Sequence, residues 1–143
     1  MSKIAVVYWS GTGNTESMAE AVADGAKEKG AEVESFTAAD FSADKMDEFD
    51  AVAFGCPSMG VEELEESEFL PMFEACESKL SGKKIVLFGS YGWGDGEWMR
   101  NWEERCIGDG AVIAADCLTV NEAPDDDALD SCKELEIGRA SCR

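Results

Sequence analysis

The chain has 143 residues, which is the size of one domain with a substantial core, and 45% of its residues are hydrophobic. Its 12 basic and 31 acidic residues give a net charge of −19, which argues against nucleic acid and anionic membranes as partners. No apolar run approaches the ~20 residues that cross a bilayer and no signal peptide is recognisable, so we expect a cytosolic protein.

Strand-like and helix-like segments alternate along the chain. Five near-continuous or alternating apolar segments predict strands over 3–9, 32–36, 50–56, 84–90 and 111–120. Segments with helical periodicity follow over 14–29, 65–80, 95–106 and 124–135, with a short helical turn near 44–48. Gly30 is expected to end the first helix, and Pro71 to interrupt or kink the second.

This alternation predicts an α/β fold, with a doubly wound parallel sheet of five strands and helices on both faces. Ligands bind to such sheets beyond the carboxyl ends of the strands, at the point where the strand order reverses. The loops after the first, third and fourth strands all belong to that edge. These three loops are therefore where a binding site is expected.

The loop after the first strand is a candidate phosphate site. It consists of Ser10, Gly11, Thr12, Gly13, Asn14 and Thr15. Glycine amides and a helix N-terminus attract an anion, and the hydroxyl and amide side chains add neutral donors. The loop lacks the lysine of a nucleoside-triphosphate loop, and Glu16 replaces the third glycine of a dinucleotide loop. The alternative is an ordinary turn in which Asn14 or Thr15 caps the helix, but the position directly after a buried strand favours a phosphate monoester.

The other two loops each present one large polarisable side chain. The second loop includes Pro57, Ser58, Met59, Gly60, Val61 and Glu62, and the third includes Ser90, Tyr91, Gly92, Trp93 and Gly94. Either Met59 or Trp93 alone could be a core residue, but a tryptophan between two glycines is not placed like one. Together they suggest a flat aromatic ligand held between a thioether and an indole.

The six cysteines form no C-x-x-C pair and the chain contains no histidine. This pattern argues against a zinc site and a disulfide framework, and it excludes mechanisms that need an imidazole. Most of the thiols are expected to lie in the core or on helix faces.

The three loops, in this order, resemble those of short-chain flavodoxins, and most closely those of clostridia and related anaerobes. The resemblance extends from about Lys3 to Leu135. It implies the flavodoxin-like strand order 2-1-3-4-5 and an FMN-binding domain over residues 1–135. It also implies non-covalently bound FMN that carries single electrons between redox proteins, and therefore an electron-transfer protein rather than an enzyme.

The resemblance also implies a role for each loop. The first would hold the FMN phosphate, Trp93 would stack on one face of the flavin, and Met59 would pack near the other. Glu62 would accept a hydrogen bond from the ring N3. Backbone groups of residues 90–94 would meet the pyrimidine edge.

In such proteins the neutral semiquinone is stabilised by the carbonyl of the residue after the loop methionine, here Gly60, which turns toward the flavin on reduction. The anionic hydroquinone would lie among carboxylates, which makes it a strong reductant, so the semiquinone–hydroquinone couple is the useful one. Val61 departs from the family pattern. A type II turn would require a positive φ at this β-branched residue, so we expect a bias toward type II′, with the carbonyl turned inward.

The expected partners are flavodoxin- and ferredoxin-type reductases and low-potential acceptors with basic docking surfaces, and the protein is expected to be a monomer. The strong negative charge could equally serve solubility alone. One alternative is a small FMN-dependent reductase of the same fold, although the chain is short for the extra loops of such enzymes. Another is an acidic signalling module, although a phosphoacceptor domain would have clustered aspartates after the first strand.

The last eight residues, 136–143, fit the rest of the chain poorly. They place Gly138 within a helical segment and add two arginines to an acidic protein. We expect this tail to be foreign to the fold, so that removing it leaves the melting temperature and the ligand affinity unchanged.

Overall fold

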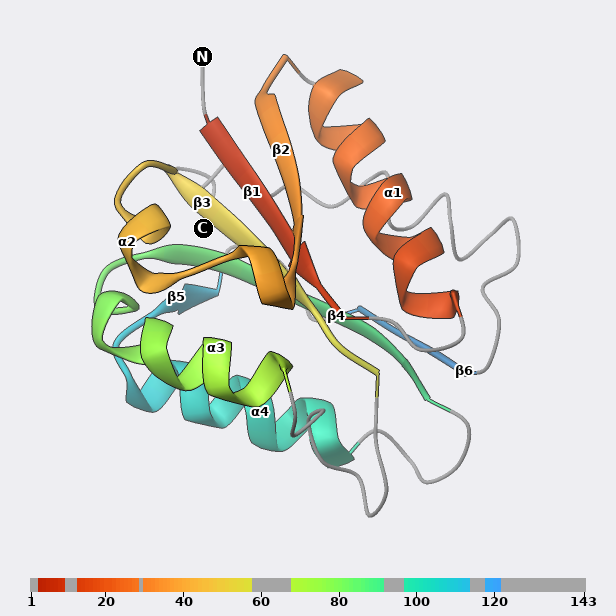
Figure 1. Cartoon of the computed structure of the whole chain (residues 1–143). Coiled ribbons are helices and arrows are strands. Elements are labelled where there is room, and N and C mark those ends of the chain that lie inside the picture. The colour runs from red at the N-terminus through yellow and green to blue at the C-terminus, as the bar shows by residue number, and fades with distance from the viewer. Residues whose placement is uncertain are drawn as a thin grey trace.

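The computed structural model describes residues 3–9, 13–28, 30–57, 68–91, 97–113 and 118–121. Its centre is a parallel sheet (Figure 1). The strands are β1 (Lys3–Tyr8), β2 (Glu32–Thr37), β3 (Ala51–Gly55), β4 (Lys84–Tyr91), β5 (Val112–Ile113) and β6 (Leu118–Asn121). Their order is β2-β1-β3-β4, and β5 and β6 both pair with β4 at the fifth position. The predicted α/β fold and its strand order are confirmed.

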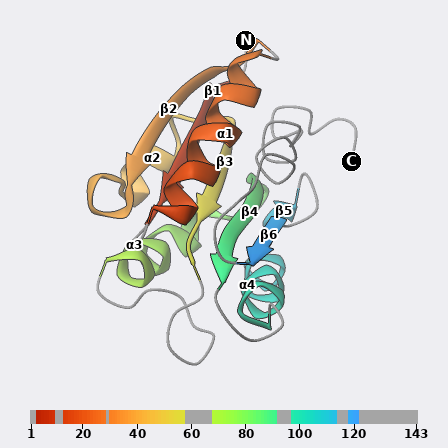
Figure 2. The same cartoon turned by 90° about the vertical axis from the view of Figure 1, so that its right-hand side faces the viewer.

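Helices cover both faces of the sheet. The helices are α1 (Asn14–Glu28), α2 (Ala43–Met46), α3 (Phe69–Cys76) and α4 (Glu97–Gly108), with 3-10 turns η1 (Ala38–Asp40) and η2 (Glu77–Lys79). Helix α1 lies on one face, and α3 and α4 lie side by side on the other (Figures 1 and 2). None of the helices in the described ranges is long and apolar enough to span a membrane.

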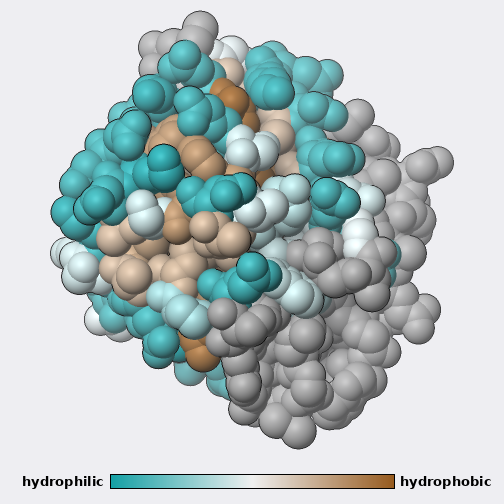
Figure 3. Space-filling model, viewed as in Figure 1, coloured by the Kyte–Doolittle hydropathy of each residue, from teal (hydrophilic) through white to brown (hydrophobic). Residues whose placement is uncertain are grey.

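The core divides into two clusters because neighbouring strand residues point to opposite faces. In β1, Ile4 and Val6 pack in the cluster that contains α1, whereas Ala5 and Val7 pack in the cluster that contains α3 and α4. All four are fully buried, as expected for a strand covered on both sides. In β2, which lies at the edge of the sheet, only Val33 and Phe36 are partly buried. On the face shown in Figure 3, hydrophilic residues lie above and to the left of an area of apolar residues.

Helix α1 follows its predicted pattern. Met18, Val22 and Ala26 are buried at intervals of four residues and form the face that meets the sheet. The helix ends where Gly30, with a φ of +92°, donates to the carbonyl of Lys27 at 3.0 Å. This left-handed glycine ends the helix as expected.

The prediction of a helix over 65–80 was wrong at its start and near its end. Glu68 has a φ of −126° and precedes the helix, which begins at Phe69 and continues as η2 after Cys76. Pro71 is therefore in the first turn, where backbone N–H groups have no partner within the helix. The expected interruption or kink at Pro71 does not arise, because the proline removes no intrahelical hydrogen bond there.

The predicted last strand, 111–120, is divided in two. Lys84 pairs with Val112, an offset of 28 positions, whereas Phe88 pairs with Leu118, an offset of 30. Two extra residues therefore lie between the two pairings. Residues 114–117, the predicted helix over 124–135 and the tail over 136–143 lie outside the described residues.

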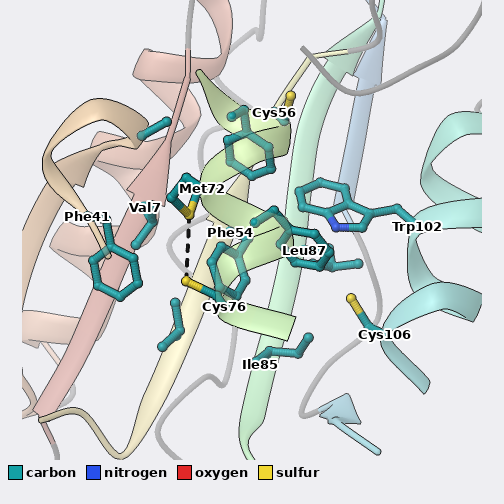
Figure 4. Close-up of a cluster of buried hydrophobic side chains, with 14 of the residues drawn as sticks. Val7, Phe41, Phe54, Cys56, Met72, Cys76, Ile85, Leu87, Trp102 and Cys106 are labelled. Atoms are coloured by element: carbon teal, nitrogen blue, oxygen red, sulfur yellow. Dashed lines mark hydrogen bonds between the residues drawn. The ribbon is translucent and has the colours of Figure 1, made fainter. Parts of the chain in front are cut away.

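Three of the six cysteines lie in the described ranges, and all three are core residues. Cys56, Cys76 and Cys106 are fully buried in the cluster shown in Figure 4, where the Cys76 thiol lies 3.9 Å from the sulfur of Met72. Burial raises the pKa of Cys76 to about 11 and that of Cys106 to about 12. Both thiols therefore stay protonated and unreactive at neutral pH.

Three charged residues join α4 to the end of α3. Arg105 donates from Nε and Nη2 to the two carboxylate oxygens of Glu77, at 2.7 and 2.5 Å. This bidentate pair lowers the pKa of Glu77. The pKa of Asp109 is raised, mainly by its interaction with the neighbouring carboxyl group of Glu77 and to a smaller extent by burial. Among the described residues, the buried Oδ2 atom of Asp109 has no hydrogen-bond partner, and two ionised carboxylates could not donate to one another.

Asp109→Asn is expected to stabilise the fold at neutral pH by about 0.5 kcal/mol. A raised carboxyl pKa favours folding only below the unfolded-state pKa, so ionised Asp109 destabilises the protein at pH 7. It also places a negative charge at the negative C-terminal end of α4. Urea unfolding should show a gain at pH 7 that fades toward pH 4, where Asp109 binds its own proton. Asp24→Asn, on the exposed side of α1, is the control, and an equal gain in both variants at pH 7 would contradict this account.

Candidate functional site

The carboxyl ends of β1, β3 and β4 lie in one row at the same edge of the sheet. Tyr8 pairs with Gly55, and Gly55 pairs with Phe88. One residue further on, Trp9 donates its N–H to the carbonyl of Gly55 at 3.0 Å, and Cys56 donates to that of Phe88 at 3.1 Å. The three loops selected from the sequence therefore start from adjoining positions, as expected.

The end of the first loop forms the N-terminus of α1. Gly13 has a φ of +94°, and its carbonyl accepts hydrogen bonds from both the N–H and the Oγ of Ser17, each at 3.0 Å. Since the carbonyl that accepts the first helical bond belongs to the cap residue, Gly13 occupies the cap position rather than Asn14 or Thr15. Thr15 is buried in the first turn. Ser10, Gly11 and Thr12 lie outside the described residues.

The described part of this loop fits a phosphate group. The N-terminus of α1 directs backbone N–H groups and the positive end of the helix dipole toward the loop. No heavy atom of the described residues would lie within 4 Å of a Cβ atom added to Gly13, so these residues leave the space beside its backbone open. A bare left-handed backbone next to open space at a helix N-terminus is what the phosphate interpretation requires.

The second loop leaves β3 through Cys56 and Pro57. Cys56 is fully buried, and its carbonyl accepts a hydrogen bond from the indole Nε1 of Trp98 in α4, at 3.3 Å. Pro57, a predicted site residue, is half-buried at the base of the loop. The remaining predicted site residues of this loop, Ser58, Met59, Gly60, Val61 and Glu62, lie outside the described residues.

The third loop leaves β4 later than predicted. Tyr91, assigned to a loop from the sequence, is the last residue of β4, because β6 extends the pairing there: Ser90 pairs with Val120 and Tyr91 with Asn121. Helix α4 begins at Glu97. The predicted site residues Gly92, Trp93 and Gly94 lie outside the described residues.

The structure adds a cavity of about 300 Å³ beside the carboxyl ends of β1 and β2. Its described lining is acidic and aromatic and comprises Tyr8, Trp9, Glu16, Thr37, Ala38, Ala39 and Glu68. Two hydrogen bonds organise it: Trp9 Nε1 donates to Glu68 Oε1 at 3.0 Å, and the Tyr8 hydroxyl donates to Glu16 Oε2 at 3.4 Å. We call this the acidic cavity.

The acidic cavity favours cations. Burial and the nearby carboxylate of Glu16 raise the pKa of Tyr8, which therefore remains a neutral hydrogen-bond donor. The described lining contains two carboxylates and two aromatic rings and no basic residue. Such a lining suits an ammonium or guanidinium group. Within the described ranges, no group of three acidic or cysteine side chains is placed to hold a metal ion. Sequence reasoning missed this cavity because its residues come from four separate segments.

Comparison with known proteins identifies clear relatives. The family model described as Flavodoxin matches residues 6–135. The chain is 50% identical over 134 residues to the flavodoxin of Clostridium beijerinckii, covering 94% of this chain and 95% of that protein. It is 48% identical over 132 residues to the flavodoxin of Megasphaera elsdenii, covering 92% and 94%.

Solved structures of flavodoxins superpose closely on this chain. The solution structure of two-electron reduced Megasphaera elsdenii flavodoxin superposes with a TM-score of 0.86 at 46% identity, covering 96% of this chain and 98% of that one. A flavodoxin from the domain Archaea gives a TM-score of 0.85 at 30% identity, covering 98% and 97%.

Proposed function

Because the chain belongs to the flavodoxin family, and is thus an electron-transfer protein rather than an enzyme, we propose that it is a low-potential carrier of single electrons with non-covalently bound FMN. The observation that supports this most directly is the meeting of three strand ends at one edge, with the N-terminus of α1 behind an open, left-handed Gly13. When bound, FMN supplies the one-electron chemistry. The protein binds it, orients it and sets its potentials.

We propose that the phosphate lies at the N-terminus of α1, within reach of the backbone N–H groups and side chains of residues 10–15. The flavin ring would lie between Trp93 and Met59, and Glu62 would accept a hydrogen bond from its N3. Residues 90–94 would contact its pyrimidine edge through their backbone. The fixed ends of β3 and β4 support this arrangement, because they bring the starts of these two loops together.

The charge of the protein favours a low potential for the second electron. The net charge is −19, and Glu16 and Glu68 add two carboxylates at the carboxyl edge of the sheet. An additional negative charge on the cofactor is costly in such surroundings. The working couple is therefore proposed to be between the neutral one-electron-reduced form and the two-electron-reduced anion.

Spectroscopy during stepwise reduction tests this function. The purified protein should be yellow, contain one FMN per chain, and pass through a blue intermediate spectrum as electrons are added. Rapid NADH or NADPH oxidation by the purified protein alone would instead support the FMN-dependent reductase. A colourless protein that does not take up added FMN would refute both alternatives.

Val61→Gly is expected to reduce the largest fraction of FMN that accumulates in the one-electron-reduced form. Glycine at this position accepts the positive φ of a type II turn, so the inward orientation of the Gly60 carbonyl loses its advantage. The conformational penalty removed is about 1 kcal/mol, or about fivefold in the turn equilibrium. Redox titration measures the effect. Val61→Ala should fall between the two, and an unchanged or larger fraction in Val61→Gly counts against this proposal.

We propose redox proteins with basic docking surfaces as the partners, of the flavodoxin- and ferredoxin-reductase type and low-potential acceptors. The acidic cavity supports this, because its carboxylates could receive a lysine or arginine side chain of a partner. The cytosolic location, the monomeric state and the domain boundary at residue 135 stay predictions.

A further inference from the structure

Two tryptophans of α4 differ in how their indole N–H groups are used. Trp98 and Trp102 lie one turn apart, and each is 2% exposed. Trp98 Nε1 donates to the carbonyl oxygen of Cys56, across 42 positions of sequence. Trp102 packs edge-on against Phe69 and Phe73, with ring centroids 5.4 and 5.8 Å apart. Its buried Nε1 has no hydrogen-bond partner in the part of the chain that the structure describes.

Packing alone explains Trp102 but not Trp98. Trp102 lies in the hydrophobic cluster shown in Figure 4, and an unpartnered buried N–H indicates that its ring, not its polar atom, is what the fold uses. Trp98 instead directs its N–H at the last backbone carbonyl before Pro57. The Cys56–Trp98 bond therefore has a specific acceptor at the point where the chain leaves β3.

Cys56 is held on three sides. Its N–H donates to Phe88 of β4 at 3.1 Å, and its carbonyl accepts from Trp98. Gly89 approaches so closely that an added Cβ would clash with the Cys56 oxygen and lie 3.2 Å from Cζ2 of Trp98. The peptide between Cys56 and Pro57 is thus fixed against both β4 and α4. Because proline also fixes its own φ, the direction in which the second loop starts is strongly constrained.

We propose that Trp98 is a positioning residue for the flavin site: its indole N–H holds the Cys56 carbonyl and thereby sets the spacing between the second and third loops. The inference rests on the proposed function. The second loop starts one residue after Cys56, and α4 starts where the third loop ends. The bond therefore connects the bases of the two loops expected on opposite faces of the flavin. Stacking is sensitive to that spacing, because a gap of 0.5–1 Å forfeits about a quarter to a half of the contact energy.

The test compares Trp98→Phe with Trp102→Phe. Both variants shorten a buried aromatic side chain in the same helix, but only Trp98→Phe removes a hydrogen bond that reaches the second loop. We expect the dissociation constant for FMN to rise about tenfold in Trp98→Phe and to stay within about twofold of wild type in Trp102→Phe. The two one-electron potentials should also shift in Trp98→Phe alone. Urea unfolding of both apoproteins reports lost packing separately.

A structural role alone would lower the unfolding midpoint of Trp98→Phe and leave its FMN affinity and potentials as they are. Equal dissociation constants in the two phenylalanine variants would therefore overturn the proposal. Should Trp98→Phe not fold, benzothienylalanine at position 98 keeps the bicyclic shape, replaces the N–H by sulfur, and should show the same loss of affinity. If the wild-type protein bound no FMN, the proposed function would fail, whereas full FMN affinity in Trp98→Phe refutes only the role of Trp98.

Discussion

Gly89→Ala is expected to lower the free energy of unfolding by about 3 kcal/mol, the upper end of the usual cost of overpacking. The added Cβ would clash with the carbonyl oxygen of Cys56, a backbone atom fixed between β4 and α4. A flexible side chain could move away, but this carbonyl can move only if β3 and β4 separate. Total stabilities of domains are about 5–15 kcal/mol, so the loss is a large share. Thermal unfolding should show a midpoint lower by about 10 °C.

Gly108→Ala is the matched control. It adds the same methyl group at the end of α4, where none of the described residues has an atom within 4 Å of the new Cβ. Alanine is the better helix former, so this variant should be as stable as wild type or up to about 1 kcal/mol more stable. Equal unfolding midpoints for the two alanine variants would show that the contact between Gly89 and Cys56 yields more easily than the structure implies.

Neutralising the acidic cavity with Glu16→Gln and Glu68→Gln together is expected to slow electron transfer to a basic partner about tenfold at low ionic strength. Glutamine keeps an oxygen that can accept the hydrogen bonds from Tyr8 and Trp9, so the cavity retains its shape and loses its charge. The difference from wild type should shrink as salt rises, since the Debye length falls from about 30 Å at 0.01 M to about 10 Å at 0.1 M. Stopped-flow measurements with a lysine-rich cytochrome c provide the rates.

The control is the double variant Glu28→Gln with Glu32→Gln. It changes the net charge by the same amount, but at the ends of α1 and β2 that lie away from the acidic cavity. If net charge alone governed association, both double variants would slow the reaction equally, and the acidic cavity would have no special role. A larger effect at Glu16 and Glu68 assigns the docking position to the carboxyl edge.

The fold class followed from local patterns because each pattern reflects one physical requirement. A strand covered on both faces must be apolar at every position, as in β1, whereas the edge strand β2 has only two partly buried residues, Val33 and Phe36, one on each face. The helix face of α1 follows in the same way from the spacing of Met18, Val22 and Ala26. Gly30 ended the helix as predicted, since a left-handed φ is a local property of glycine.

The errors arose where a distant partner decides the structure. Helical periodicity continued back to Glu65, but Glu68 turns out of the helix and its carboxylate accepts a hydrogen bond from Trp9, 59 positions earlier. The last strand looked continuous because its apolar pattern does not show pairing offsets. Only the register against β4 reveals the two extra residues before β6.

The sequence by itself determined the parallel sheet and the position of the three loops at its carboxyl edge. It also determined that the first loop is rich in glycine and hydroxyl residues. These features could be predicted because backbone conformation and strand burial depend on nearby residues. Only the tertiary structure decided which atoms meet at that edge. The contact of Trp98 with Cys56, the exclusion of any side chain at Gly89 and the acidic cavity each join segments far apart in the chain. Such contacts depend on the register and packing of the whole sheet, and no local pattern of residues encodes them.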